Sequence, residues 1–265
     1  MPTTNAICIK WGDKFPSDYV NHLYAGVRRN IDGDLRFLCM TEDRAGIRPE
    51  VEILPLRSEP FDAALETALA RSRRKGAFRK VSLFRPGLIP DLEGPLLGFD
   101  LDVVITGNLQ PLLDFAPGKV CMRKDWVQAH RLRSIGHGSV FRFDPARHGY
   151  LYEDFATDPA AEVRKAHGSE QWYTSTTAMR HGDFAFYPEE WIASFKHDAF
   201  YWPPFNLFLA PRLPPQALVV CFHGTPKIDQ AIEGYRGNLM NFTRPTQWVA
   251  DNWLTPAPGD NPRAP

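Results

Sequence analysis

The sequence predicts an α/β fold, in which one domain holds a mostly parallel central sheet covered by helices. Short apolar runs of strand length alternate with amphipathic segments early in the chain, and this alternation is typical of parallel sheets. The length of 265 residues suits one large domain or two small ones, and no linker-like segment divides it. We therefore expect a single domain over residues 1–254 and a disordered, proline-rich tail over residues 255–265.

The clearest elements lie in the first half of the chain. Ser17 can cap a helix over residues 17–30. In that helix Val20, Leu23 and Val27 share one apolar face, as helical spacing requires. Apolar runs predict strands at residues 6–10, 35–40, 51–54 and 96–99.

The remaining elements follow a looser pattern. Further strands are expected at residues 119–122, 139–143 and 217–222. Further helices are expected at residues 59–74, 78–84, 169–179 and 246–254. The stretch 191–213 is rich in aromatic residues and proline, and its pattern predicts no regular element.

Composition narrows the classes of function. Lys+Arg and Asp+Glu balance at 31 each, so no basic excess points to nucleic acid. No apolar run is long enough for a transmembrane segment, and residues 1–5 lack a signal-peptide pattern, which predicts a cytoplasmic protein. The four cysteines lie apart in short apolar runs, as expected of buried thiols in a reducing compartment.

Two carboxylates interrupt the apolar run 96–105. Asp100 and Asp102 are one residue apart, so an extended segment would place both on one face. Two anions in an apolar neighbourhood are unfavourable unless a positive charge lies between them. Carboxylates suit hard divalent cations, and the pair therefore predicts a site for Mn²⁺ or Mg²⁺ that serves phosphate chemistry.

A second polar signal follows the late apolar run 217–222. His223, Gly224 and Lys227 come directly after it, and ligands of open α/β sheets bind where strands end. A neutral imidazole could complete a metal site. A glycine lets the backbone approach a phosphate, and a lysine can neutralise it. A solvated turn is the alternative explanation of these three residues.

Several motifs common in other enzymes are missing from the sequence: a Walker loop, a dinucleotide-binding glycine fingerprint, a zinc-protease HExxH and a nucleophile elbow. The segments that remain resemble, in order, those of GT-A fold nucleotide-sugar glycosyltransferases, most closely glycosyltransferase family 8. The resemblance extends from residue 6 to about residue 253. Its markers are IKWGDK at 9–14, RFLCMT at 36–41, RKVSLF at 79–84, FDLDVV at 99–104, GSVFRF at 138–143, GSEQW at 168–172 and FHGTPK at 222–227.

The resemblance implies a GT-A-type, Rossmann-like domain with a metal site. Asp100 and Asp102 would be the D-x-D pair, with Asp102 the more direct ligand of Mn²⁺ or Mg²⁺. His223 would be the third protein ligand. In family 8 this histidine commonly stands three residues before the glycine, where this chain has Cys221.

The resemblance also implies where the donor binds. Lys10, Trp11, Gly12 and Thr41 would frame the base and ribose. Either Arg79 or Lys80, with Lys80 favoured, would lie near the diphosphate or the donor sugar. Gly224 and Lys227 would hold the diphosphate.

Glu170 and Gln171 are the residues expected to act in catalysis, because the resemblance places them beside the anomeric carbon. Ser169 stands where an aspartate is common in the family. The implied activity is transfer of a sugar, of hexosyltransferase type, from a nucleoside-diphosphate sugar to a glycan or other acceptor. The resemblance to family 8 further implies retention of the anomeric configuration.

Two other functions are alternatives. The pattern D-x-D-x-V at Asp100 also fits a haloacid-dehalogenase-type phosphatase, in which the first aspartate attacks phosphorus. That class carries the motif on its first strand, whereas three strands are expected before it here. A nucleotide-sugar-binding module without catalysis is the second alternative, with Ser169 as its support.

Two surface features bear on partners. Trp202 and Phe205 lie in a loop rich in aromatic residues and could stack on acceptor sugars, with ordinary packing as the alternative. The basic run 71–75 could make a peripheral contact with an anionic membrane, although a solvated helix end is the commoner explanation.

Overall fold

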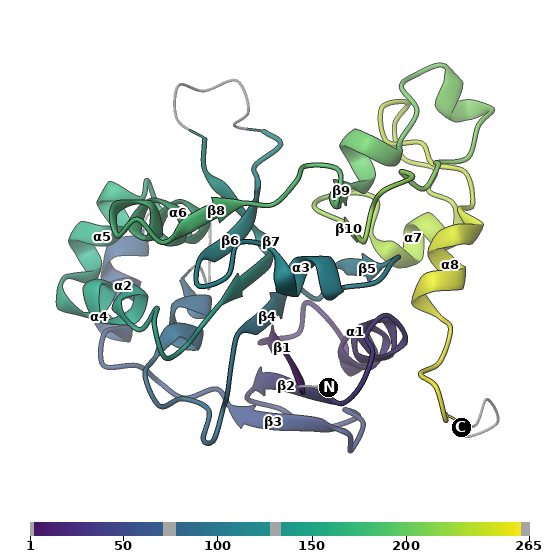
Figure 1. Ribbon diagram of the computed structural model, residues 1–265. Coiled ribbons are helices and arrows are strands. Elements are labelled where there is room, and N and C mark those ends of the chain that lie inside the picture. The colour runs from purple at the N-terminus through teal and green to yellow at the C-terminus, as the bar shows by residue number, and fades with distance from the viewer. Residues whose placement is uncertain (1–2, 71–77, 128–133, 261–265) are drawn as a thin grey trace.

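A computed structural model describes residues 3–70, 78–127 and 134–260 of the protein. Its centre is a seven-stranded sheet with the strand order β3-β2-β1-β4-β7-β6-β8 (Figure 1). A smaller sheet, of order β5-β10-β9, lies beside it. Four of the six neighbouring strand pairs described in the large sheet are parallel, so the expected mostly parallel α/β fold is confirmed.

The parallel half of the sheet follows the predicted strands closely. It is made of β1 (Thr4–Lys10), β2 (Leu35–Thr41), β3 (Val51–Pro55) and β4 (Leu96–Phe99). Every residue of β1 is buried, because β1 lies between β2 and β4 and both of its faces are covered. The predicted helix is α1 (Ser17–Arg29), whose Val20, Leu23 and Val27 are buried.

In the other half of the sheet one strand, β7, runs against the rest. This half contains β6 (Val120–Lys124), β7 (Gly136–Phe143) and β8 (Phe184–Phe186). β7 is antiparallel to both β4 and β6. As a result the residues at the start of β7 lie beside the carboxyl end of β4, where the acidic pair begins.

The acidic pair does not lie on one extended strand, so the predicted placement of both carboxylates by strand alternation is wrong. β4 ends at Phe99, the chain bends through residues 100–102, and β5 (Val103–Ile105) then enters the smaller sheet. There β5 pairs antiparallel with β10 (Val219–Cys221), which pairs with β9 (Ile192–Ser194). The apolar run 96–105 is thus two strands in two sheets, because the bend between them changes the pairing partner.

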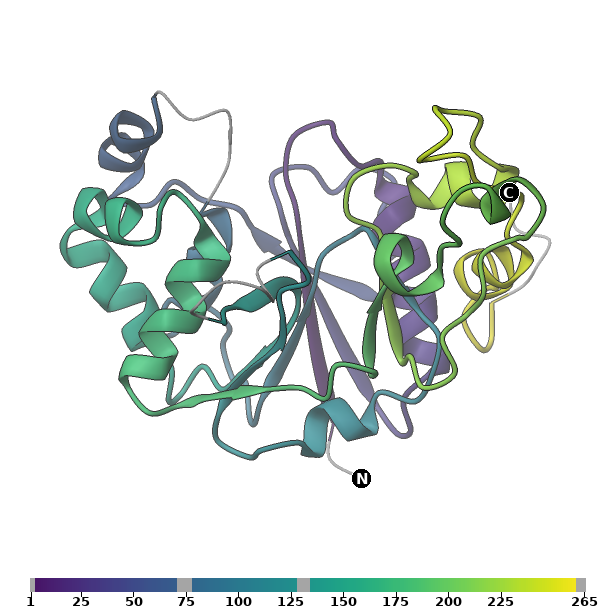
Figure 2. The same ribbon diagram turned by 90° about the horizontal axis from the view of Figure 1, so that it is seen from above.

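Helices cover both sides of the sheet, as Figure 2 shows from above. On one side lie α2, α4, α5, α6 and the 3₁₀ turn η1, and on the other lie α1, α7 and α8. Their bounds, with α3 and two further turns, are α2 (Asp62–Leu69), η1 (Arg79–Phe84), α3 (Gln110–Asp114), α4 (Tyr150–Thr157), α5 (Pro159–Lys165), α6 (Glu170–Arg180), η2 (Phe195–Ala199), η3 (Phe205–Leu207), α7 (Ile228–Glu233) and α8 (Gln247–Trp253).

Several of these helices were not predicted. α3, α4, α5 and α7 have between five and eight residues each, which is too short for a helical repeat of apolar residues to stand out. The helix expected over residues 59–74 is α2, and residues 71–74 of that prediction lie outside the described residues, as does the basic run 71–75.

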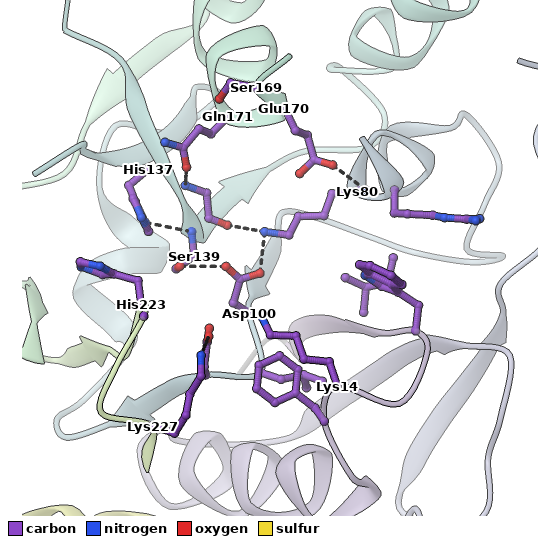
Figure 3. Close-up of a pocket in the computed structure, with 18 of the residues that line it drawn as sticks. Lys14, Lys80, Asp100, His137, Ser139, Ser169, Glu170, Gln171, His223 and Lys227 are labelled. Carbon is purple, nitrogen blue, oxygen red and sulfur yellow. Dashed lines mark hydrogen bonds and ion pairs between the residues drawn. The ribbon is translucent and has the colours of Figure 1, made fainter. Parts of the chain in front are cut away.

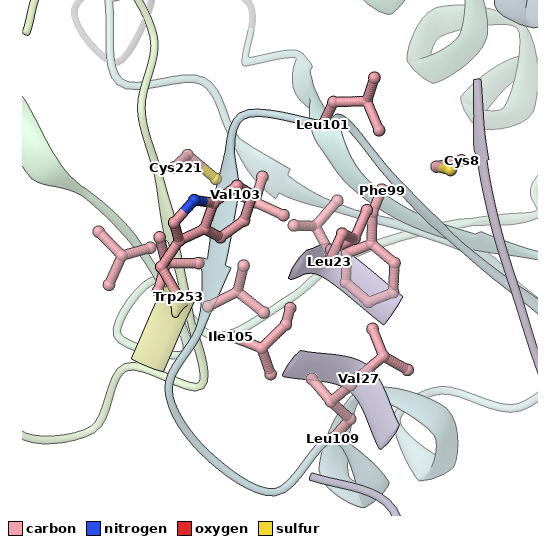
Figure 4. Packing of buried hydrophobic residues seen from close by; sticks show 14 of the residues in the cluster. Cys8, Leu23, Val27, Phe99, Leu101, Val103, Ile105, Leu109, Cys221 and Trp253 are labelled. Atoms are coloured by element: carbon pink, nitrogen blue, oxygen red, sulfur yellow. The ribbon is translucent and has the colours of Figure 1, made fainter. Parts of the chain in front are cut away.

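The largest core cluster fills the space between α1, β5, β10 and α8 (Figure 4). Trp253 of α8 is 2% exposed there and belongs to the same cluster as Val103 of β5 and Leu23 of α1. All four cysteines are buried and free, as the apolar context of each predicted. Leu101 belongs to the same cluster as Trp253, so the bend at residues 100–102 is anchored in this core.

The C-terminal segment is partly described. Asp260 forms an ion pair with Arg48 at 2.6 Å, and Ala257 is buried. Residues 261–265 lie outside the described residues, so the expected disorder of the tail stays a prediction. Among the described residues, no helix combines the length and the apolar character that crossing a bilayer requires.

The carboxyl end of β4 is sensitive to volume at Gly98. A methyl group there would lie 2.2 Å from Cζ of the buried Phe141 on β7. We expect Gly98→Ala to lower the free energy of unfolding by about 1–3 kcal/mol, because an overpacked core must shift its side chains or backbone. Urea unfolding measures the change. Gly138→Ala is the matched control, since its methyl would approach no heavy atom closer than 3.5 Å, and an equal loss in both variants would contradict this packing argument.

Candidate active site

A cavity of about 590 Å³ opens at the carboxyl ends of β1 and β4, next to the end of β10 (Figure 3). Segments from every part of the chain contribute to its wall. The lining residues are Ile9, Trp11, Lys14, Phe15, Arg79, Lys80, Asp100, Leu101, Asp102, His137, Gly138, Ser139, Gly168, Ser169, Glu170, Gln171, His223, Gly224 and Lys227. Ten of the thirteen residues that the sequence singled out for a site are among them.

Asp100 is the most firmly held acid in the cavity. Its backbone N–H donates to the carbonyl of Ser139 at 2.8 Å, which continues the β4–β7 ladder by one residue. Its Oδ1 lies 2.5 Å from Nζ of Lys80, and its Oδ2 accepts the Ser139 hydroxyl at 2.8 Å. Burial is the largest single influence and would raise the pKa of this carboxyl, but the charge and hydrogen bond of Lys80, together with the Ser139 hydroxyl and His137, leave that pKa lowered.

Lys80 connects three parts of the wall. It lies on η1, and its Nζ donates to the carbonyl of Gly138 at 2.8 Å as well as pairing with Asp100. Its backbone N–H donates to Oε2 of Glu170 at 3.0 Å. Burial would lower the pKa of the ammonium group, yet the charges of Asp100 and Glu170 leave that pKa raised. Lys80 is thus a fixed positive charge at the centre of the site.

Asp102 has much weaker compensation. Within the part of the chain that the structure describes, its ion pair is with Nζ of Lys227 at 3.9 Å, and its side chain is 15% exposed. Burial, and next the negative charge of Asp100, raise the pKa of Asp102 to about 6. The carboxylate therefore carries a charge at neutral pH that the protein only partly neutralises.

Glu170 and Gln171 begin α6 at the opposite side of Asp100 from Lys14 and Lys227 (Figure 3). Both ends of the Gln171 amide are engaged: Oε1 accepts the N–H of Gly138 at 3.2 Å, and Nε2 donates to Asp125 at 2.5 Å. Asp125, at the end of β6, is buried. Gln171 is therefore held in one orientation, whereas Glu170 faces the Lys80 segment.

His223 lines the cavity two residues after the end of β10. Its Nε2 is 2.8 Å from the hydroxyl of Ser194, and its ring centre is 5.2 Å from Trp126 and 5.6 Å from His137. Burial, followed by the nearby His197, lowers the pKa of His223 to about 4. The imidazole is accordingly neutral at neutral pH, which is the form that binds metals.

Lys227 and Gly224 belong to the loop that leads into α7. Lys227 is the residue before α7, and its backbone N–H donates to Oε1 of Gln230 at 2.8 Å. Gly224 has a φ of +93°, a conformation that glycine adopts without strain. Both residues line the cavity, so an anion bound there could contact the loop backbone and the ammonium group together.

Three predicted donor-binding residues do not line the cavity. Lys10 and Thr41 are paired neighbours at the ends of β1 and β2, and both are buried. The Thr41 hydroxyl donates to the carbonyl of Asp43 at 3.0 Å within its own turn. The Gly12 N–H donates to Glu42 at 2.8 Å. These three residues flank Trp11, which does line the cavity.

Sequence reasoning assigned no role to several residues of the wall. Lys14 and Phe15 follow the first strand, and the ammonium group of Lys14 lies 4.5 Å from the Phe15 ring centre. Ser139 and His137 come from the start of β7. In the sequence, Lys14 and Ser139 are marked as site residues only by lying within the segments 9–14 and 138–143 that carry the resemblance.

The expected metal ligands do not form a closed cluster. In residues 3–70, 78–127 and 134–260, no three His, Cys, Asp or Glu side chains are grouped so as to hold a metal ion. Asp100 is engaged by Lys80 and Ser139, and His223 by Ser194. All three expected ligands nevertheless line the same cavity.

No protein-family model and no curated protein matches the sequence. Solved glycosyltransferase structures do share its fold. The galactosyltransferase LgtC, in complex with donor and acceptor sugar analogs, matches with a TM-score of 0.61 and 10% identity over 98% of each chain. GlyE of Streptococcus pneumoniae TIGR4 matches with a TM-score of 0.56 and 12% identity, over 97% of this chain and 67% of GlyE. Mouse xyloside xylosyltransferase 1 matches with a TM-score of 0.51 and 13% identity, over 85% of this chain and 98% of the xylosyltransferase.

These likenesses show that the chain has the GT-A glycosyltransferase fold that the resemblance implied. They do not favour the phosphatase alternative. Three strands, β1, β2 and β3, precede β4, the strand that leads into the acidic pair, whereas that class carries its aspartate on the first strand.

The two acids should have opposite effects on stability. Asp102→Asn removes a buried charge that is poorly compensated. The pKa of Asp102 in the folded chain lies about two units above its ordinary value. We therefore expect the variant to raise the free energy of unfolding by about 1–3 kcal/mol at about pH 8. Because the folded pKa of about 6 lies above the ordinary 3.8, the charge is unfavourable only as pH rises through that range. The stabilisation by Asp102→Asn should therefore vanish as the pH falls to about 3.8.

Asp100→Asn is the matched comparison. It leaves the Lys80 ammonium group without its carboxylate, so we expect a loss of about 1–3 kcal/mol at the same pH. Urea unfolding in the presence of a chelator measures both variants without metal. Changes of the same sign in both would contradict the assignment of Lys80 to Asp100.

Proposed function

We propose that the protein is a metal-dependent glycosyltransferase that moves a sugar from a nucleoside-diphosphate sugar to a glycan or other acceptor. The observation that carries the proposal is the cavity at the bend between the two sheets, where Asp100 and Asp102 meet Lys80 and Lys227. The GT-A fold supports it, because the similar LgtC structure is described as holding donor and acceptor sugar analogs.

The chemistry of the donor set fits a divalent cation. Two carboxylates and one neutral imidazole line the same cavity, and burial, followed by the charge of Asp100, raises the pKa of Asp102. Asp102, with Asp100 and His223, would hold Mn²⁺ or Mg²⁺. Such an ion acts as a Lewis acid toward a diphosphate leaving group.

The protein's own cations would hold the diphosphate. Lys227 lies at the start of α7, next to the exposed backbone of Gly224, and its only ion pair among the described residues is the long contact with Asp102. An ammonium group with such a weak partner is available to an incoming phosphate. In a partly dry cavity its charge also stabilises the negative charge that grows as the bond to the sugar breaks.

The donor sugar would lie toward α6. Glu170 is the acid closest to Lys80 on that side, and Gln171 is the amide fixed by Gly138 and Asp125. A carboxylate or amide beneath the anomeric carbon stabilises the positive charge of an oxocarbenium-like transition state. We assign this role to Glu170, with Gln171 as the second candidate, and the resemblance to family 8 supports retention of configuration.

The nucleotide would lie toward the end of β1. Trp11, which is 37% exposed, offers the indole face beside the cavity, and Lys10, Gly12 and Thr41 support the loop that carries it. The acceptor would approach past Asp125 and Trp126 on the β6 side.

A thermal-shift screen tests the proposal. Nucleoside diphosphates and their sugars, each with and without Mn²⁺, should raise the melting temperature only when the metal is present, because a ligand that binds only the folded state stabilises it. At one hundred times its dissociation constant the correct donor gives about 2.7 kcal/mol, which is roughly 5–10 °C for a chain of this length. Asp102→Asn should abolish the metal-dependent shift while remaining folded. An unchanged shift in that variant would falsify the proposed metal site.

Lys227→Met tests the diphosphate contact. We expect donor affinity to fall by about tenfold to a hundredfold, because one charge-assisted contact contributes about 1.5–3 kcal/mol. Lys119→Met is the control, since Lys119 pairs with Asp183 away from the cavity. Calorimetric titration with the donor and Mn²⁺ measures both, and equal affinities in the two variants would remove Lys227 from the site.

A further inference from the structure

Two loops of the C-terminal third expose large apolar side chains in one place. They are residues 200–212, which contain η3, and residues 234–246, which follow α7. Figure 1 shows them side by side at the outer end of the molecule, in green and yellow-green beyond α7. The exposed side chains, here named the apolar patch, are Trp202 (64%), Phe205 (62%), Phe208 (73%), Leu209 (45%), Leu239 (53%) and Met240 (51%).

One buried asparagine joins the two loops. Asn206 is 1% exposed, and its Nδ2 donates to the carbonyls of Leu239 at 2.8 Å and Phe242 at 3.0 Å. Arg244 donates to the carbonyl of Leu207 at 3.2 Å. These hydrogen bonds hold the backbones of the two loops together, so the apolar side chains of both loops stay in one patch.

The charge of the loops points to the partner. Neither residues 200–212 nor residues 234–246 contain an aspartate or glutamate. The charged residues of both loops are Arg212, Arg236 and Arg244, and all three are exposed. The chain as a whole has equal numbers of acidic and basic residues, whereas these two loops have basic residues and no acidic ones.

We propose that the apolar patch docks the protein onto an anionic lipid bilayer. Exposed Trp, Phe and Leu side chains, in two loops whose charged residues are all arginines, suit the boundary between headgroups and acyl chains, where apolar area is buried and positive charge meets anionic lipid. A sugar would need several hydrogen-bonding side chains beside an aromatic ring, whereas among the six side chains of the patch only Trp202 has an N–H or O–H group. The proposal rests on the two loops alone and is independent of the donor site.

Vesicle sedimentation tests the proposal with the full chain. The protein should bind phosphatidylglycerol vesicles, bind phosphatidylcholine vesicles more weakly, and lose affinity as salt is added, because salt screens the arginine contribution. Phe205→Ser combined with Phe208→Ser should reduce the partition coefficient by about tenfold or more. Arg212→Gln combined with Arg236→Gln should reduce it by about fivefold per arginine, on anionic vesicles only.

Leu254→Ser is the matched control, since Leu254 is 52% exposed but lies outside both loops. It should bind as the unaltered chain does. Circular dichroism checks that each variant is folded, and every substituted side chain is exposed. Failure of the unaltered chain to bind phosphatidylglycerol vesicles would overturn the proposal. So would a concentration-dependent dimer that the phenylalanine variant abolishes, because the patch would then be covered by a second copy of the chain.

Discussion

The bend of the chain between the two sheets, at residues 100–102, is the constraint on which the site depends. Two backbone hydrogen bonds hold it: Asp100 donates to Ser139 on β7, and Phe222 after β10 donates to Asp102, both at 2.8 Å. Because β5 pairs with β10, the loop after β10 is carried to the same edge as the end of β4. His223, Gly224 and Lys227 thereby reach a cavity whose other walls come from β1, β7 and α6.

Nearby cations neutralise the two carboxylates at this bend to different degrees. In our proposal this difference favours the binding of a metal ion at Asp102. Lys80 neutralises Asp100, whereas Asp102 has one long ion pair among the described residues, with Lys227, and further influence from the charges of Lys14 and Lys80. A carboxylate that the protein fully neutralises gains little from a cation, while a poorly compensated one gains much. Sites of this kind lower the stability of the folded chain in exchange for binding, which is a common relation between activity and stability.

The sequence predicted those parts of the fold that are encoded locally. β1, β2 and β4 are continuous apolar runs, and α1 has a complete apolar face, so each could be recognised without its neighbours. β5 and β9 have three residues each, and their partner β10 lies far along the chain, so no local pattern marks them. The same limit applies to the site. Asp100, Lys80 and Glu170 were each predicted as site residues, but the ion pair between Lys80 and Asp100 was not. That pair joins segments that are distant in the sequence and that only the fold brings together.

The stretch 191–213, in which the sequence predicted no element, contains both buried and exposed aromatic residues for different physical reasons. Phe195 is 1% exposed and stacks on Phe222, so it belongs to the core beside the site. Trp202, Phe205 and Phe208 are exposed although the hydrogen bonds of Asn206 hold the adjoining backbone in place. Because packing of the domain does not require these side chains, their apolar character is better explained by a contact outside the chain than by folding.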